Sequence, residues 1–190
     1  MDRLIVALGN PGIKYAHTRH NIAWEALDFL PAQENETWKD KFKGQFCSIR
    51  DADDKIHFLK PQTFMNLSGE SVAPMAKFFK ISVENILIIH DELDLPYGSI
   101  AFKSGGGLAG HNGLKSSAAC LGSQDFKRLR LGIGRPMFSS VSDWVLSGYS
   151  SDEAAVFETY MKGVVEALEL YMKEGFQKAA SKFSKKNILG

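Results

Sequence analysis

The pattern of hydrophobic residues near the start of the chain predicts a buried strand followed by a helix. Residues 4–8 form an apolar run with the length and composition of a buried strand. Asn10, Pro11 and Gly12 then interrupt it, because proline has no N–H to donate and glycine accepts positive φ. Apolar residues recur at helical spacing after His20. Asn10 is therefore expected at the carboxyl end of a strand, and His20 near the start of a helix.

Further apolar runs predict a sheet of at least six strands. Residues 42–49 and 55–60 flank an acidic turn and predict an antiparallel hairpin. Residues 86–90 form the most apolar run, which is typical of a central strand buried on both faces. Residues 99–103 and 127–133 add two more strands. The alternation of basic and apolar residues in the last of them predicts one solvent-facing side.

Three more helices are predicted among these strands. The first follows Ser68, the expected N-cap, because apolar residues recur there at i, i+3, i+4 and i+7. A short helix is expected over residues 114–121. The longest begins at a capping box formed by Ser150 and Glu153 and ends near Gly175. Residues 31–41, 105–113 and 137–150 are expected to be loops, and the tail from about residue 176 to be helical, frayed or disordered.

Length and composition narrow the class of protein. A chain of 190 residues, 44% hydrophobic and 24% charged, is typical of one globular domain. The two cysteines, Cys47 and Cys120, have no metal-ligand spacing, which argues against a zinc site or a disulfide framework. There is no signal-peptide pattern and no apolar run of membrane length, so we expect a cytoplasmic enzyme or binding protein.

The net charge of +1 is unevenly distributed along the chain. Residues 103–135 hold six basic residues against one acidic residue, and residues 173–190 hold five against one. Such sorting is compatible with a surface that binds a polyanion. Charge alone fits solvated helix and loop faces equally well.

His20 and Asp91 are the strongest candidates for chemistry. Taken singly, each is better explained as a structural or turn residue. Both, however, are expected at the sheet edge where open α/β sheets bind ligands, with Tyr15 and Arg19 around the same cleft. A carboxylate bonded to one imidazole nitrogen would leave the other nitrogen as a base.

Three asparagines, Asn10, Asn66 and Asn112, add a second clue. Each is explained by turn chemistry alone, but together they could offer amide donors to a substrate carbonyl. There is no serine-nucleophile elbow, phosphate-binding loop or dinucleotide fingerprint, so water is the expected nucleophile. Neighbouring strand residues point to opposite faces, so the acidic and histidine residues of 90–94 and 111 do not predict a metal site.

In these same segments the sequence resembles the bacterial-type peptidyl-tRNA hydrolase family. Five blocks in the right order, within about residues 3–180, carry the resemblance. They are Gly9-Asn10-Pro11-Gly12 with Tyr15 and Thr18-Arg19-His20-Asn21; Thr63-Phe64-Met65-Asn66-Leu67-Ser68-Gly69; His90-Asp91-Glu92-Leu93-Asp94; Lys103 with Gly105-Gly106-Gly107 and Gly110-His111-Asn112-Gly113-Leu114; and Phe126 with residues 128–136.

The resemblance implies one domain over residues 1–190, a monomer with a mixed, twisted sheet flanked by helices on both faces. It implies hydrolysis of the ester between peptide and tRNA, which recycles tRNA from prematurely released peptidyl-tRNA, without metal or cofactor. His20 would be the general base, oriented by Asp91. Asn10 and Asn66 would position the substrate or the water.

The resemblance also assigns the surroundings of the site. Asn112 would contact water or substrate, and Tyr15, Met65 and His111 would line the cleft. The tRNA phosphates would be contacted by Lys103 and Arg130. The segments 105–113 and 136–150 would gate the cleft.

Two other function classes remain open. Relatives of this fold that bind RNA without hydrolysis would be expected to lose a catalytic residue, whereas His20, Asp91, Asn10 and Asn66 are all present. A hydrolase of small esters or amides that used the same pocket would not need the basic residues of 103–135. Both observations favour the peptidyl-tRNA hydrolase.

Overall fold

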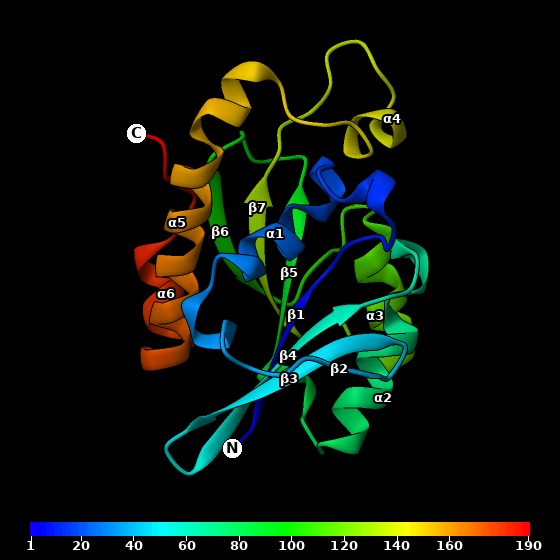
Figure 1. The fold of residues 1–190 in the computed structure, drawn as a ribbon, viewed down its shortest axis with the longest axis vertical. Helices are drawn as coiled ribbons and strands as arrows, with labels where there is room; N and C mark the ends of the chain where they lie inside the picture. Colours follow the sequence, from blue (N-terminus) through cyan, green and yellow to red (C-terminus); the bar gives the residue numbers. More distant parts are fainter.

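A mixed sheet of eight strands forms the centre of the computed structural model, which describes residues 1–190 (Figure 1). The strands are β1 (Arg3–Ala7), β2 (Lys39–Lys41), β3 (Gly44–Asp51), β4 (Asp54–Pro61), β5 (Ile86–Glu92), β6 (Ser99–Ser104), β7 (Lys127–Gly132) and β8 (Lys186–Asn187). Their order is β2-β3-β4-β1-β5-β7-β6-β8. The four strands β4, β1, β5 and β7 run parallel, so their carboxyl ends share one edge of the sheet.

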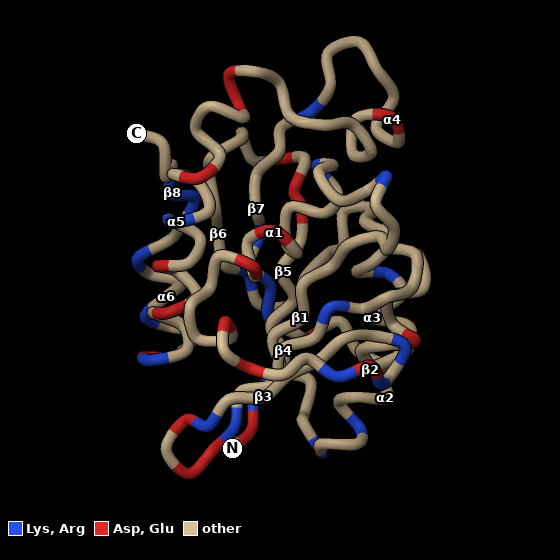
Figure 2. Tube along the Cα trace, viewed as in Figure 1, with Lys and Arg blue, Asp and Glu red and all other residues tan.

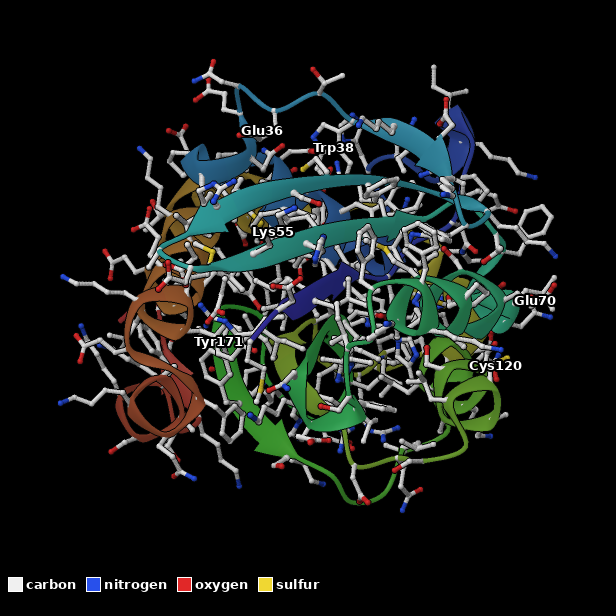
Figure 3. All side chains as sticks on the ribbon, turned by 90° about the horizontal axis from the view of Figure 1, so that it is seen from below. Glu36, Trp38, Lys55, Glu70, Cys120 and Tyr171 are labelled. Carbon is white, nitrogen blue, oxygen red and sulfur yellow. The ribbon has the colours of Figure 1, made fainter.

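Helices cover both faces of this sheet, as predicted. The helices are α1 (Ile22–Asp28), α2 (Gly69–Phe78), α3 (Asn112–Leu121), α4 (Val141–Val145), α5 (Ser151–Glu174) and α6 (Phe176–Lys182). One core cluster joins the sheet to α1, α5 and α6, and a smaller cluster joins it to α2 and α3. Figure 3 shows these layers from the end opposite α4, with Tyr171 between α5 and the sheet. No helix is both long and apolar enough to span a membrane.

Several predicted elements are confirmed. All seven residues of β5 are buried, so this strand is the central one. The capping box of Ser150 and Glu153 starts α5, and Gly175 ends it. The predicted hairpin is present as β3 and β4. The first strand begins at Gly44 rather than at Phe42, because Phe42 and Lys43 adopt positive φ in the turn after β2.

Two local predictions are wrong. Ser68 is not an N-cap, because the 3-10 turn Met65–Leu67 continues directly into α2 and the Ser68 hydroxyl donates to the Met65 carbonyl. The side of β7 predicted to face solvent is largely covered, because Arg128 is only 1% exposed beneath the glycine-rich segment of residues 105–107 and Arg130 is half-buried.

The three segments expected to be irregular contain short elements. Residues 31–41 include a 3-10 turn and β2, and residues 137–150 include α4. The tail forms α6 and then β8, which pairs with Ser99 and Ile100 of β6. The helix in the tail agrees with one of the alternatives expected for it. Short length explains why the elements within 31–41 and 137–150 were missed, because one or two turns of helix carry too few apolar residues for a periodic pattern.

Candidate active site

A cavity of about 530 Å³ lies at the carboxyl ends of β1 and β5, beneath α4. Asn10 follows β1, His20 lies in the 3-10 turn Arg19–Asn21, and Asp91 lies near the end of β5. The other lining residues are Met65, Asn66, His90, Glu92, Leu93, Leu108, Ala109, Gly110, His111, Asn112, Arg135, Val141, Ser142, Val145 and Leu146. The fold therefore brings the predicted histidine, carboxylate and three asparagines to one cavity.

His20 and Asp91 form the predicted pair. The distance from His20 Nδ1 to Asp91 Oδ2 is 2.8 Å. The pKa of Asp91 is well below its ordinary value: burial alone would raise it, but His20 and His111 outweigh burial. Because an ionised carboxylate only accepts, Nδ1 carries the proton of the neutral His20 ring, and Nε2 of that neutral form keeps a lone pair. That Nε2 has no hydrogen-bond partner in the protein, so it can take a proton from a molecule in the cavity.

His111 shares the same carboxylate but has no free nitrogen. Its Nε2 lies 2.7 Å from Asp91 Oδ1 and donates to it. Its Nδ1 accepts hydrogen bonds from the amides of Gly113 and Leu114 and thereby caps α3. Both ring nitrogens are occupied, so His111 is suited to holding Asp91 rather than to moving a proton.

His20, Asp91 and His111 are also the one group that could be considered for a metal ion, with candidate ligand atoms within 4.8 Å of one another. The Nδ1 lone pair of His111 is already used by the amides that start α3, and both oxygens of Asp91 accept hydrogen bonds. A metal ion would have to displace these bonds. The donor set therefore fits a hydrogen-bonded triad better than a metal centre.

The electrostatics of the pair favour a charged imidazolium. Burial alone would lower the pKa of His20, but the charge of Asp91 and the hydrogen bond to it outweigh burial and raise that pKa above 6.5. By contrast, burial lowers the pKa of His90 far below its ordinary value, so His90 stays neutral. His90 Nδ1 lies 2.9 Å from the Asp91 carbonyl oxygen, which can only accept, so this nitrogen holds the proton.

Asn10 presents an amide donor whose orientation is fixed. Its Oδ1 accepts the Met65 backbone N–H at 2.7 Å, so Nδ2 is left without a partner in the protein. Its backbone N–H and carbonyl are both bonded to the Asn21 side chain at 2.9 Å. The residue before it, Gly9, packs directly against Trp24, and a Cβ at this position would be 2.6 Å from the indole ring. Asn21 therefore positions Asn10, although it was not predicted as a site residue. Its position next to His20 in the sequence could have indicated this role.

The remaining cavity predictions have different outcomes. Asn66 and Asn112 are exposed at the cavity with unbonded side chains, and Met65 is a buried part of its wall. Tyr15 is half-buried and does not line the cavity. It lies in a 3-10 turn outside it, with Lys14 Nζ 4.8 Å from its ring centre.

Arg19, expected beside the cleft, is turned away from it. The side chain is buried and its guanidinium bonds to Ser147, the Gly148 carbonyl and Glu153, while it stacks 3.5 Å from the ring centre of Trp144. The Arg19 backbone N–H also donates to the Ser147 carbonyl. Arg19 thus connects the turn that carries His20 to the segment between α4 and α5.

Lys103 and Arg130 lie on β6 and β7 and do not line the cavity. Lys103 is exposed. Arg130 Nε donates to Glu92 Oε1 at 2.8 Å, so Arg130 is already paired with a carboxylate of the cavity wall. The apolar part of the wall includes Met65, which was predicted to line the cleft, and Leu146, which lies in the segment 136–150 predicted to gate it; Leu93 was not predicted.

Comparison with known proteins identifies the family. A family model described as Peptidyl-tRNA hydrolase matches residues 4–189. The peptidyl-tRNA hydrolase of Geotalea uraniireducens is 45% identical over 188 residues, 98% of each chain, and that of Bdellovibrio bacteriovorus is 43% identical over 184 residues, 95% of this chain and 98% of its own. The crystal structure of peptidyl-tRNA hydrolase from Acinetobacter baumannii superposes with a TM-score of 0.85 at 36% identity, covering 98% of this chain and 96% of that one. The chain therefore belongs to the peptidyl-tRNA hydrolase family.

Proposed function

We propose that the chain hydrolyses the ester bond between peptide and tRNA in peptidyl-tRNA, using water activated by His20 and no metal ion. Family membership supports the reaction, and the unoccupied Nε2 of His20 carries the mechanism. No other histidine of the cavity combines a free nitrogen with a carboxylate partner: His111 uses both nitrogens, and His90 bonds to a backbone carbonyl.

In this mechanism His20 Nε2 removes a proton from water as the water oxygen bonds to the ester carbonyl carbon. Asp91 stabilises the imidazolium that forms. When the tetrahedral intermediate collapses, the carbon–oxygen bond to the ribose breaks, and the imidazolium returns its proton to the leaving ribose oxygen. One water is consumed, and a free carboxylate end and a ribose hydroxyl are produced.

The asparagines supply donors to the oxygen on which charge develops. Asn10 Nδ2 is held in place by two partners, whereas Asn66 and Asn112 are exposed and adapt to the substrate. A positioned base is worth about 10²–10⁴-fold in rate, and one oxyanion donor about 10²–10³-fold. Met65 and His111 form the cavity wall, and Tyr15 lies outside it, where only an extended substrate would reach it.

The tRNA portion is bound by basic side chains outside the cavity. Lys103 is free to contact a phosphate, and Arg130 does so while it remains beside Glu92. Lys178 and Lys182 of α6 add positive charge at one edge of the molecule (Figure 2). We place the protein in the cytoplasm as a monomer that recycles tRNA from prematurely released peptidyl-tRNA.

The test is release of the peptide from an N-acetyl-aminoacyl-tRNA in the presence of EDTA. We expect release by the unmodified protein and by His17→Ala, which removes an exposed histidine of the same segment, but not by His20→Ala. Binding of tRNA without release by the unmodified protein would instead support an RNA-binding function. Release abolished by EDTA would refute a metal-independent mechanism.

A further inference from the structure

Arg128 is a buried cation with incomplete partners. The residue is 1% exposed, and its Nη2 donates to the carbonyls of Gly105 and Gly107, both at 3.0 Å. Its Nε has no hydrogen-bond partner. No carboxylate lies within ion-pair distance, because Glu92 on the same face is bonded to Arg130. Burial of a guanidinium without an anion is costly. An anion that reached Arg128 in place of the two glycine carbonyls would therefore bind favourably.

Arg128 also neighbours both of the residues proposed to contact tRNA. Lys103 of β6 is directly opposite Arg128 of β7, and Arg130 follows two residues later on the same face. Opposed residues of paired antiparallel strands lie on one face with their Cβ atoms about 4.5–5.5 Å apart. The three cations therefore form a cluster on the side of the sheet that faces α3, with Lys103 and Arg130 each next to Arg128, and only Arg128 is fully buried.

The cover is built from glycine. Gly105 and Gly106 adopt φ of +60° and +82°, and the space around Gly107 is open. Lys103 lies against Gly106 from outside, so the segment is held between Lys103 and Arg128. Apart from the Gly105 amide bonded to the Phe126 carbonyl, two carbonyl–guanidinium bonds hold this segment down. It has no large side chain that must be unpacked when it moves.

We propose that Arg128 is a third phosphate-binding cation of the tRNA surface, covered by residues 105–107 in the free protein and uncovered when a backbone phosphate replaces the two carbonyls. The inference rests on the proposed function, because it requires that tRNA binds along Lys103 and Arg130. It predicts that the glycine segment lifts on binding and that three cations, rather than two, release counterions.

The first test is the salt dependence of binding to a tRNA that carries an N-acetyl-aminoacyl group through an uncleavable amide. Each phosphate contact contributes about 0.7–0.9 to the slope of log affinity against log salt. Arg128→Gln should reduce the slope by that amount, whereas Arg128→Lys should keep it. Lys39→Gln, which removes an exposed lysine of β2 outside the basic segment 103–135, is the control and should not change the slope.

An unchanged slope in Arg128→Gln would overturn the inference and leave Arg128 as a clamp for the loop. The proposed function fails separately, when the unmodified protein neither binds the amide-linked tRNA nor releases peptide from the ester. The two failures are therefore distinguishable.

A second test uses the unmodified protein and does not depend on whether a variant folds. Hydrogen exchange of the Gly105 amide, which is bonded to the Phe126 carbonyl in the free protein, should become faster in the tRNA complex. The amides of Gly113 and Leu114, which are bonded to His111, should not become faster. Slower exchange at Gly105 in the complex would contradict the lifting of the segment.

Discussion

His20 and His111 share the Asp91 carboxylate, through Nδ1 of His20 and Nε2 of His111, and their remaining ring nitrogens have different surroundings. His20 Nε2 has no partner in the protein, whereas His111 Nδ1 accepts the amides that begin α3. The sequence predicts that His20 and Asp91 lie together, since both follow strand ends at one edge of the sheet. It does not predict the difference between the two imidazoles, which depends on the position of α3 relative to β5.

Replacement of Asp91 by asparagine should change the pH dependence of kcat/KM, because the charge of Asp91 raises the pKa of His20. His20 must be neutral to act as a base, so kcat/KM should fall as the pH drops through the raised pKa of His20. Asparagine removes the charge that raises this pKa and leaves the burial that lowers it. We expect the acid limb of the kcat/KM profile to move to lower pH, with the plateau reduced by about 10²–10⁴-fold. Asp94→Asn, which removes an exposed carboxylate paired with Arg135, is the control, and an acid limb that does not move in Asp91→Asn would contradict the assignment.

At the scale of elements, an ion pair connects the 3-10 turn that carries His20 to the first turn of α5. Arg19 and Glu153 form a buried ion pair, with side chains 3% and 15% exposed. Arg19→Gln leaves the Glu153 carboxylate without its cation, and loss of one partner of a buried pair costs about 3–5 kcal/mol. Arg135→Gln breaks an exposed pair with Asp94 and should cost at most about 1 kcal/mol. Urea unfolding of both variants measures the difference; equal losses would mean that Arg19 does not anchor the segment after α4.

The elements also show where prediction from sequence succeeds. The strand β5 and the helix α5 were predicted because a long apolar run and a capping box are signals within a single segment. The burial of Arg128 was missed because a loop distant from β7 in the sequence covers it. The Ser68 cap was predicted wrongly because the 3-10 turn before α2 has no distinct sequence pattern. Local signals thus predict elements, whereas contacts between elements need the structure.

At the scale of the whole molecule, the burial of His90 makes the free energy of unfolding depend on pH. Burial lowers its pKa far below 6.5, so the folded state keeps it neutral while the unfolded state binds a proton below about pH 6.5. Its contribution to stability is therefore present above that pH and is lost as the pH falls. The slope for one proton is about 1.4 kcal/mol per pH unit. His90→Gln should reduce the pH dependence of the unfolding free energy below pH 6.5 by that amount.

Exposed His17 provides the comparison for that experiment. Its side chain is 87% exposed and bonded to Glu25, so His17→Gln should leave the decline below pH 6.5 in place. The same decline in His90→Gln as in the unmodified protein would show that His90 is protonated in the folded state.

The distribution of charge gives a second prediction for the whole molecule. Lys103→Ala combined with Arg130→Ala should raise KM for tRNA esters and flatten the salt dependence of KM, because phosphate contacts dominate affinity. The loss on a short peptidyl-nucleoside ester, which lacks those phosphates, should be at least tenfold smaller. Equal losses on the two substrates would mean that these side chains support the fold near Glu92 rather than bind tRNA.

The most direct test of the account is the pH dependence of the single-turnover rate on N-acetyl-aminoacyl-tRNA for His20→Ala beside His111→Asn. We expect His20→Ala to lose about 10²–10⁴-fold in rate together with the acid limb. His111→Asn should be slower because Asp91 loses one partner, yet it should keep the acid limb, since His20 Nε2 remains the base. An acid limb that persists in His20→Ala and disappears in His111→Asn would contradict the assignment of His20 as the base.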